Sequence, residues 1–355
     1  MYIKLVVIKY LLPIVKRLLA VIGGKPSGQT ESLGPGSKPK MLSIEPTSRC
    51  NLNCPFCLVG QQNSLKSTEH DLLPRGMGDM KWSLYEKIVK DAADFGIEKI
   101  QLHFQGEPLL YKRFPDMVKE AKKYGLSTQV FTNGLPLTEK KADEVILAGL
   151  DSLRFSVDGA SQETYELNRV GGEFEKVYRN MAMMVKRAKK HKSSIDLLWQ
   201  FIALSNNEHE IEKARKLAKA INIPFFIKTF AESVPNLVPR NPKLRRELHV
   251  KPCTDIYRST FVYYTGEVVV CCYDLEGQHV VGDLKEQSLI EVWNSEKYKT
   301  MRTRINNADQ NPEEEPEICK NCLKWTHKDY LPQAVSLIDA DKRLTSNLNG
   351  AEDLV

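Results

Sequence analysis

Clustered cysteines are the residues with the clearest chemical potential in this 355-residue sequence. Three of them, Cys50, Cys54 and Cys57, lie within eight residues. Five more follow much later in the chain: Cys253, Cys271, Cys272, Cys319 and Cys322. Such clustering is typical of metal or cluster ligation, because disulfide frameworks belong mostly to small secreted domains.

The first three thiols lie in a segment that we call the Cys loop, residues 50–57 (CNLNCPFC). Asn51, Asn53 and Pro55, which lie between the thiols, are residues that turns favour, so the chain could wrap around a ligand. A 4Fe-4S cube needs four ligands, and three thiolates would leave one iron open to a group from outside the protein. The alternatives are a zinc site and a chance cluster of thiols.

The region after residue 40 alternates short apolar runs with amphipathic stretches. The runs predict strands at residues 42–45, 100–104, 128–131, 152–157, 195–201 and 225–228. The amphipathic stretches predict helices near residues 84–95, 113–124, 138–148, 174–190 and 208–221. Two helix starts carry capping signals: Ser83 with Glu86, and Asn207 with Glu210. This alternation predicts an α/β fold with a parallel sheet, closed wholly or partly as a (β/α)6 barrel.

Polar motifs follow several of these strands. The Cys loop comes after the first strand, residues 105–108 (QGEP) after the second and residues 132–134 (TNG) after the third, while residues 156–159 (SVDG) overlap the end of the fourth. Active sites of parallel α/β sheets lie at the carboxyl ends of the strands. We therefore expect these motifs to share one site.

Taken together, the motifs resemble those of the radical S-adenosylmethionine (SAM) superfamily. Its C-x3-C-x-aromatic-C loop follows the first barrel strand, and Phe56 supplies the aromatic residue here. The resemblance implies a partial (β/α)6 TIM-like barrel in which Cys50, Cys54 and Cys57 hold a 4Fe-4S cluster. It also implies that the open iron binds the amino and carboxylate groups of SAM. An electron from the cluster then yields methionine and a 5'-deoxyadenosyl radical, which abstracts hydrogen from a substrate.

Further residues match positions that contact SAM in this family. Residues 105–108 resemble its Gly-Gly-Glu-Pro motif, which contacts the methionine amino group, although Gln105 replaces the first glycine. Ser156 and Asp158 match the place of the ribose contacts, and Arg169 suits the SAM carboxylate, with a solvated surface arginine as the alternative. The SAM contacts implied in this way are Gln105, Gly106, Glu107, Pro108, Thr132, Asn133, Ser156, Asp158 and Arg169, of which Thr132 and Asn133 could also be turn residues only.

The later cysteines resemble the SPASM module, or its shortened twitch form, which ligates auxiliary iron-sulfur clusters. Two auxiliary clusters need more thiols than the five that remain, so we expect one auxiliary 4Fe-4S cluster. Its expected ligands are Cys253, Cys271, Cys319 and Cys322. A structural zinc site with four thiolates is the alternative.

Cys272 raises a separate question, because neighbours in a strand point to opposite faces. The spacing from Gly266 favours Cys271 as the ligand. Cys272 would then share a face with Val268 and Val270 and is most simply a core thiol. The alternative is that it donates a hydrogen atom to a substrate radical, as cysteines do in radical epimerases. Weaker candidates, as proton carriers, are His103, Asp274 and His279.

The sequence also predicts how the chain is divided. Residues 1–23 form a basic, apolar arm that would be an amphipathic helix, either against a membrane or against the body, and residues 24–40 form a Gly/Pro/Ser linker. The radical SAM core would span residues 41–245, a small Cys-rich α+β module residues 246–327 and a tail residues 328–355.

The charge balance bears on the partners. Seven of the 51 basic side chains but only one of the 45 acidic ones lie in residues 1–40, so 44 of each remain in the body. This balance argues against general nucleic-acid binding. The absence of a clear secretory leader favours a cytoplasmic setting, peripheral at the inner face of the membrane through the arm.

We therefore expect a radical SAM enzyme, an oxidoreductase that dehydrogenates a sugar, aminocyclitol or lipid-linked saccharide. The reasons for this substrate are that residues 1–40 are short for a peptide-recognition domain and that the arm suggests a membrane surface. Its electron donor would be a flavodoxin or ferredoxin. Peptide modification by epimerisation or cross-linking is the alternative. An iron-sulfur electron carrier and a zinc-stabilised binding module are alternatives from other classes.

Overall fold

The computed structural model describes residues 38–65, 72–229, 237–245, 249–250, 253–308, 310–320, 322 and 325–326. These residues belong to one compact unit that begins at Lys38. The arm predicted at residues 1–23, most of the linker and the tail predicted at residues 328–355 lie outside the described residues.

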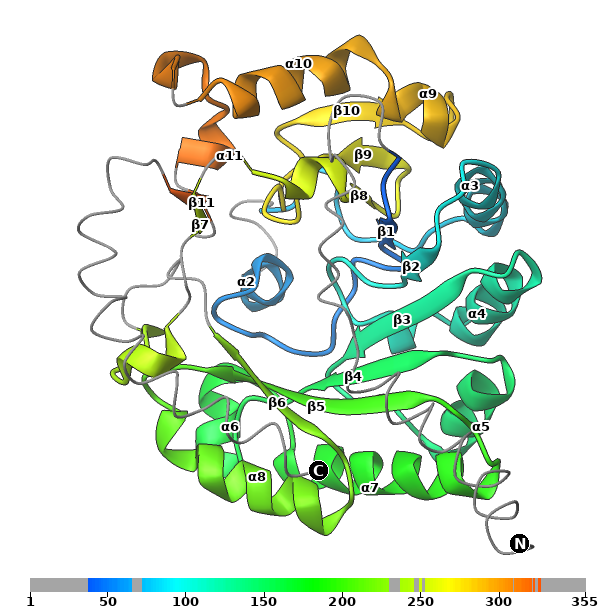
Figure 1. Cartoon of the computed structure of the whole chain (residues 1–355). Coiled ribbons are helices and arrows are strands. Elements are labelled where there is room, and N and C mark those ends of the chain that lie inside the picture. The colour runs from blue at the N-terminus through cyan, green and yellow to red at the C-terminus, as the bar shows by residue number, and fades with distance from the viewer. Residues whose placement is uncertain are drawn as a thin grey trace, which may run out of the picture. The chain divides into compact units, whose positions relative to one another are not determined.

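Six parallel strands that follow one another in the sequence form the main part of a nine-stranded sheet (Figure 1). They are β1 (Met41–Ile44), β2 (Lys99–Gln101), β3 (Ser127–Thr132), β4 (Ser152–Ser156), β5 (Asp196–Ala203) and β6 (Phe225–Thr229). Each strand pairs in parallel with the next, and β6 ends the sheet at one edge. The expected partial barrel is confirmed, and no closed barrel forms among the described strands.

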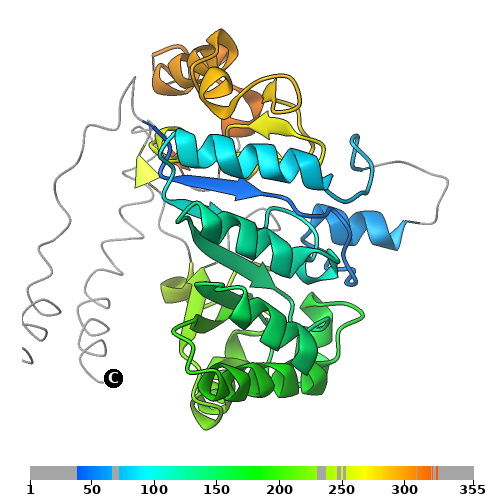
Figure 2. The same cartoon turned by 90° about the vertical axis from the view of Figure 1, so that its right-hand side faces the viewer.

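Helices cover one face of this sheet (Figures 1 and 2). They are α3 (Trp82–Asp94), α4 (Phe114–Lys123), α5 (Glu139–Leu147), α6 (Gln162–Asn168), α7 (Phe174–Lys190) and α8 (Ile211–Ala220), and a 3-10 turn at Glu208–Glu210 precedes α8. Their buried apolar residues, such as Val118 and Val145, join Val130 and Leu153 of the strands in one hydrophobic core. The helix periodicity in the sequence therefore identifies the face that packs on the sheet.

The other face of the strands carries polar side chains. Gln101 Nε2 donates to Gln129 Oε1 at 2.8 Å, and Gln129 Nε2 donates to Ser152 Oγ at 3.2 Å. Because side chains alternate between the two faces of a strand, the same strands supply an apolar core on one side and a polar surface on the other.

The C-terminal module continues the same sheet. A hairpin forms from β8 (Ser259–Val262) and β9 (Glu267–Val269), with Gly266 in its turn at φ 102°, and β10 (Val280–Asp283) pairs with β9. Strand β8 also pairs in parallel with β1, which the sequence pattern did not predict. The remaining elements are α9 (Leu289–Trp293), α10 (Glu296–Asn306), α11 (Glu317–Lys320), a two-stranded sheet of β7 (His249–Val250) with β11 (Trp325–Thr326), and short 3-10 turns.

Three local predictions were wrong. Helix α3 begins at Trp82 after Lys81, so Ser83 is not its cap. Asn207 does not cap its 3-10 turn, because its Oδ1, the oxygen that would cap, accepts the Leu204 N–H at 2.7 Å instead. Strand β9 ends at Val269, so Cys271 and Cys272 lie beyond it.

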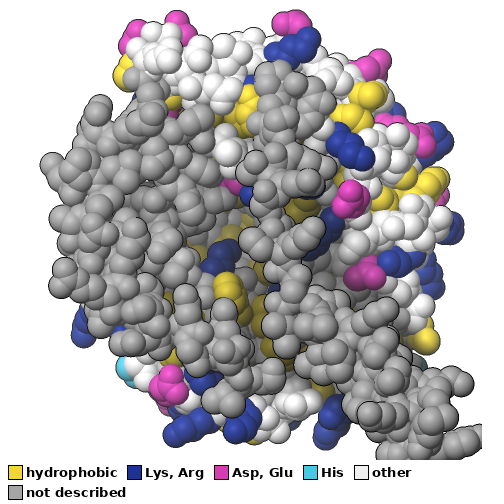
Figure 3. All heavy atoms as spheres, in the orientation of Figure 1, with side chains coloured by type: hydrophobic (Ala, Val, Ile, Leu, Met, Phe, Trp, Pro, Cys, Tyr) yellow, Lys and Arg dark blue, Asp and Glu magenta, His cyan; other side chains and the backbone are white. Residues whose placement is uncertain are grey.

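The surface carries charges of both signs. On the face shown in Figure 3, Lys and Arg side chains alternate with Asp and Glu side chains over the upper and right-hand margins. Of the described helices, none is long and apolar enough to cross a membrane.

Candidate active site

The Cys loop lies at the carboxyl end of β1 and is held by α2 (Leu58–Ser64) (Figure 2). Asn63 Nδ2 donates to the backbone oxygen of Cys50 at 3.0 Å. Gly60 lets the helix approach the loop, because a Cβ at this position would lie 2.4 Å from the backbone nitrogen and oxygen of Cys54. The thiols of Cys50, Cys54 and Cys57 all line one cavity.

The turn formed by residues 105–108 packs directly on the chain that leads into the Cys loop. Gly106 has φ 73°, and a Cβ there would lie 2.3 Å from the backbone oxygen of Thr47. The next backbone N–H, of Glu107, donates to the oxygen of Arg49 at 2.8 Å. Only glycine fits this combination of positive φ and close backbone approach.

The carboxylate of Glu107 is 2% exposed and connects two of the predicted motifs. It accepts hydrogen bonds from the Thr132 hydroxyl and the Asn133 backbone, each at 2.7 Å. Burial raises the pKa of Glu107, and these hydrogen bonds oppose that shift. The Asn133 amide nitrogen also lies 4.0 Å from Cys50 Sγ. Thr132 and Asn133 therefore contact the other motifs and are more than turn residues.

Arg169 lies between Asp158 and the Cys loop. Its Nε and Nη2 lie 2.7 and 2.6 Å from Asp158 Oδ2, and its Nη1 lies 3.9 Å from Cys54 Sγ. The Arg169 side chain is 12% exposed and lines the cavity, so the solvated-surface alternative is wrong. Asp158 is fully buried, its Oδ1 accepts the Ile202 N–H at 2.7 Å, and it does not line the cavity.

Residues of all four polar motifs predicted at the strand ends line one cavity of about 680 Å³. Its lining contains most of the predicted SAM contacts, namely Gly106, Glu107, Thr132, Asn133, Ser156 and Arg169. Gln105, Pro108 and Asp158 do not line it. The rest of the wall mixes polar side chains of the strands, Ser43, Gln101, His103, Gln200 and Lys228, with apolar ones such as Phe104, Phe131 and Phe261. The sequence reasoning missed most of these wall residues, although their alternation with apolar neighbours was the available signal.

Of the three weaker candidates, only His103 lines this cavity. Its ring lies 4.5 Å from that of Phe131, and burial lowers its pKa to about 3. The imidazole is therefore neutral near pH 7, and its role as a proton carrier stays a prediction. Asp274 is buried and accepts the backbone N–H groups of Gly277, Gln278 and His279 at 2.8 to 3.0 Å, which is a structural role.

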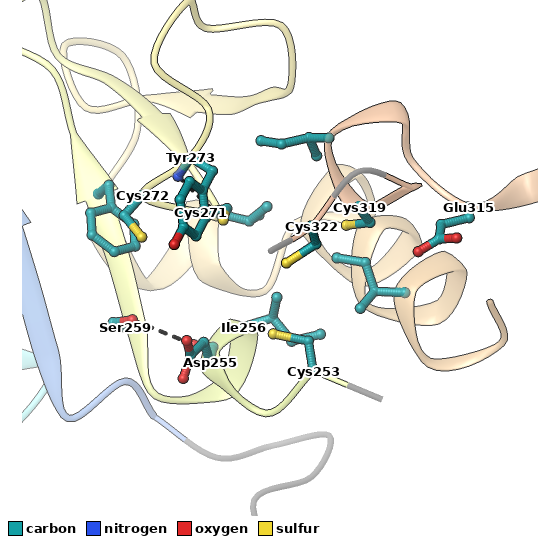
Figure 4. A pocket seen from close by; sticks show the side chains of 14 residues that line it. Cys253, Asp255, Ile256, Ser259, Cys271, Cys272, Tyr273, Glu315, Cys319 and Cys322 are labelled. Atoms are coloured by element: carbon teal, nitrogen blue, oxygen red, sulfur yellow. Dashed lines mark hydrogen bonds between the residues drawn. The ribbon is translucent and has the colours of Figure 1, made fainter. Parts of the chain in front are cut away.

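The later cysteines surround a second, smaller cavity (Figure 4). Cys253, Cys271 and the pair Cys319 and Cys322 come from three segments of the module, and Ile256 and Val270 are among the apolar residues that line the cavity with them. Burial raises the pKa of Cys253 to about 11. Within the described part of the chain, no three Cys, His, Asp or Glu side chains lie close enough to hold one metal ion.

The donor sets of both cavities fit iron-sulfur clusters. Cluster ligands in proteins are mainly cysteine thiolates, and a surrounding shell of hydrogen-bond donors tunes them. In the first cavity, Arg169 and Asn133 supply such donors to Cys54 and Cys50. In the second cavity, four thiols line one space in largely apolar surroundings.

Cys272 lines both cavities. Cys272 is exposed, whereas Val268 and Val270 are buried, so the prediction of a core thiol was wrong. The reason is that the strand ends at Val269, and the alternation of faces stops with it.

Comparisons with known proteins agree with this geometry. Residues 44–218 match the model of the radical SAM superfamily, and residues 253–323 match SPASM, an iron-sulfur cluster-binding domain. The chain therefore belongs to the radical SAM superfamily. More particularly, it is a radical SAM enzyme with a C-terminal SPASM domain. The first domain implies a 4Fe-4S cluster that binds SAM, and the second implies auxiliary iron-sulfur clusters.

Two relatives and one solved structure resemble this chain. A tungsten-containing aldehyde ferredoxin oxidoreductase cofactor-modifying protein of Pyrococcus furiosus is 25% identical over 315 residues, covering 74% of this chain and 83% of that protein. The PqqA peptide cyclase of Granulibacter bethesdensis is 31% identical over 135 residues, 38% of this chain but only 32% of the cyclase. The structure of Streptococcus suis SuiB bound to precursor peptide SuiA has a TM-score of 0.59 at 14% identity, covering 75% of this chain and 67% of SuiB, and so supports the fold alone.

Proposed function

We propose that this chain cleaves SAM reductively at the Cys loop and uses the resulting radical to abstract hydrogen from a small polar substrate in the same cavity. The observation that carries the proposal is that the three thiols, the turn at 106–107 and the polar face of the sheet line one cavity of about 680 Å³. Ordinary ligand pockets measure roughly 300–1,000 Å³, so the size suits small ligands.

The protein groups have distinct roles in this proposal. Cys50, Cys54 and Cys57 hold the first cluster, and Cys253, Cys271, Cys319 and Cys322 hold one auxiliary cluster. When bound, the first cluster would supply the electron for SAM cleavage, and the auxiliary cluster would take up the electron that the substrate loses.

SAM itself would be held by groups that are already positioned. Glu107, oriented by Thr132 and Asn133, accepts the amino group of SAM. Arg169 pairs with its carboxylate, and Ser156 reaches the ribose. Asp158 holds Arg169 in place, because both of its oxygens already have protein partners.

The substrate would be a sugar, aminocyclitol or lipid-linked saccharide that the enzyme dehydrogenates. Gln101, Gln200 and Ser43 offer amide and hydroxyl groups to a hydroxylated ring, and neutral His103 offers a further one. The radical takes one hydrogen atom from the carbon of an alcohol and becomes 5'-deoxyadenosine. Loss of the hydroxyl proton and of one electron then gives the carbonyl, which is a net two-electron oxidation of the substrate.

The test is anaerobic turnover of the reconstituted full chain with dithionite and SAM. We expect methionine and 5'-deoxyadenosine, with deuterium transferred to 5'-deoxyadenosine from an alcohol labelled at its carbinol carbon. A Cys50→Ala variant should form neither product while keeping about half of the iron, because the second set of thiols remains. Absence of 5'-deoxyadenosine from the iron-loaded wild-type chain would refute the proposal.

Peptide modification is the second candidate function. It gains support from the similarity to a PqqA peptide cyclase and from the fold shared with SuiB, a protein whose structure is known with a bound precursor peptide. A mass shift in a peptide but not in any sugar or aminocyclitol, under the same conditions, would favour this candidate over dehydrogenation.

A further inference from the structure

Gln105 replaces the first glycine of the expected motif. It connects the turn of residues 105–108, which we call the SAM turn, to the C-terminal module. It is 6% exposed, and its Nε2 donates to the backbone oxygen of Leu275 at 2.7 Å. Leu275 lies in the loop of residues 271–279, which we call the module loop and which begins with Cys271 and Cys272. A glycine at position 105 could not make this bond.

The same carbonyl oxygen accepts a second buried donor. Arg75 Nη1 donates to it at 2.8 Å, and Arg75 Nη2 lies 3.3 Å from Glu45 Oε1. The side chains of Arg75 and Glu45 are 4% and 0% exposed, and the Arg75 guanidinium lies 3.8 Å from the ring centre of Tyr263. Two donors on one carbonyl fix the position of Leu275 more closely than either alone.

Glu45 ties this contact to the end of β1. Its Oε2 accepts the backbone N–H of Tyr264 in the hairpin at 3.0 Å, and the backbone of Gln105 also donates to this carboxylate. One buried carboxylate therefore joins the first strand, the SAM turn and the hairpin of the C-terminal module.

The module loop is itself cross-linked by hydrogen bonds. The Asp274 carboxylate accepts three consecutive backbone N–H groups, and the Tyr263 hydroxyl donates to the Asp274 backbone oxygen. A displacement of Leu275 would therefore be passed to Cys271 and Cys272, which lie four and three residues before it.

We propose that Gln105 is a positioning residue that couples SAM binding to the module loop, and thereby to the thiols that this loop presents to both cavities. The inference rests on the proposed contact of residues 105–108 with SAM. Binding of SAM reduces the motion of the turn. The hydrogen bond from Gln105 then reduces the motion of Leu275 as well.

Anaerobic hydrogen-deuterium exchange of the cluster-loaded full chain, with and without SAM, tests the coupling. In the wild-type chain, SAM should slow exchange both in the Cys loop and in residues 271–279. In Gln105→Met, which keeps the length but lacks the donor, protection of the Cys loop should persist while that of residues 271–279 is lost. Without SAM, exchange in residues 271–279 should be on the order of fivefold faster in this variant, as for the loss of one hydrogen bond.

Gln278→Met is the matched control, because Gln278 is exposed and lies in the same loop without contacting the turn. It should keep the SAM-dependent protection. Gln105→Gly, which restores the motif of the family, should behave as Gln105→Met does. Agreement between the two variants would show that the effect comes from loss of the donor and not from the introduced methionine. Equal protection of residues 271–279 in wild type and Gln105→Met, or protection of the Cys loop alone in the wild type, would overturn the coupling. Absence of protection everywhere would instead overturn the proposed SAM site and the coupling with it.

Discussion

Arg169 is held by Asp158 through two nitrogens on one carboxylate oxygen, at 2.7 and 2.6 Å, inside the protein. Removing one partner of a buried ion pair leaves an uncompensated charge and typically costs about 3–5 kcal/mol. We therefore expect Asp158→Ala to lower the free energy of unfolding by about that amount, measured by urea denaturation of the apo chain. The double variant Asp158→Ala/Arg169→Met should recover part of this loss. A double variant as unstable as the sum of the two single variants would show that the pair is not coupled.

Gly106 and Gly125 provide a matched pair for the close approach of the SAM turn. Both have positive φ, 73° and 71°, but a Cβ at Gly106 would lie 2.3 Å from Thr47 O, whereas one at Gly125 would meet nothing within 4 Å. Gly125→Ala should cost about 1–2 kcal/mol of stability, as expected for the backbone conformation alone, and leave SAM cleavage intact. Gly106→Ala should cost more and abolish 5'-deoxyadenosine formation. Equal losses for the two variants in thermal melts and SAM cleavage would contradict this account.

His103 should give the fold a measurable pH dependence. Burial lowers its pKa to about 3, below the ordinary value of 6.5, so the folded chain disfavours the proton. Its contribution to stability is complete above pH 6.5 and is lost as the pH falls towards 3. Between pH 6.5 and 5.5 the wild type should lose about 1 kcal/mol that His103→Gln does not lose, because one pKa unit corresponds to about 1.4 kcal/mol. Denaturant titrations of both chains at these pH values measure the difference, and parallel curves would show that His103 is accessible to protons.

The roles of Cys271 and Cys272 can be distinguished by measuring iron content and deuterium incorporation. Cys271→Ala should lower the iron content by about half, because it removes a proposed auxiliary ligand, whereas Cys272→Ala should keep the iron of both clusters. If Cys272 donates a hydrogen atom, turnover of the wild type in D2O should place deuterium in the product, and Cys272→Ala should not. Unchanged turnover and product stereochemistry in Cys272→Ala would exclude that role.

The sequence predicts the core of this fold well where a local pattern encodes it. Helix α7, at Phe174–Lys190, has the predicted bounds, because its apolar stripe is long and regular. The parallel order of the first six strands follows from their alternation with helices. In contrast, the pairing of β8 with β1 joins segments more than 200 residues apart, and the apolar run of β8 would suit many partners.

In the candidate site, too, some features could be predicted from local sequence and others could not. The Cys loop and the glycine of the turn are recognisable because their spacing and residue type are restricted by chemistry and sterics. The burial of Asp158 behind Arg169, the position of His103 and the bond from Gln105 to Leu275 depend on tertiary packing. The end of β9 before Cys271 also changed the environment of Cys272 in a way that alternation could not predict.

Strand β8 has a consequence for how the two matched domains depend on each other. It lies along β1, and the Glu45 N–H beyond β1 donates to the oxygen of Val262 at 2.9 Å. Without the C-terminal module, the first strand of the barrel would present an open row of backbone donors and acceptors, a surface that invites aggregation. The SPASM module thus also supplies part of the wall of the larger cavity, through residues such as Ser259 and Phe261, and the radical SAM domain of this chain is structurally unfinished without it.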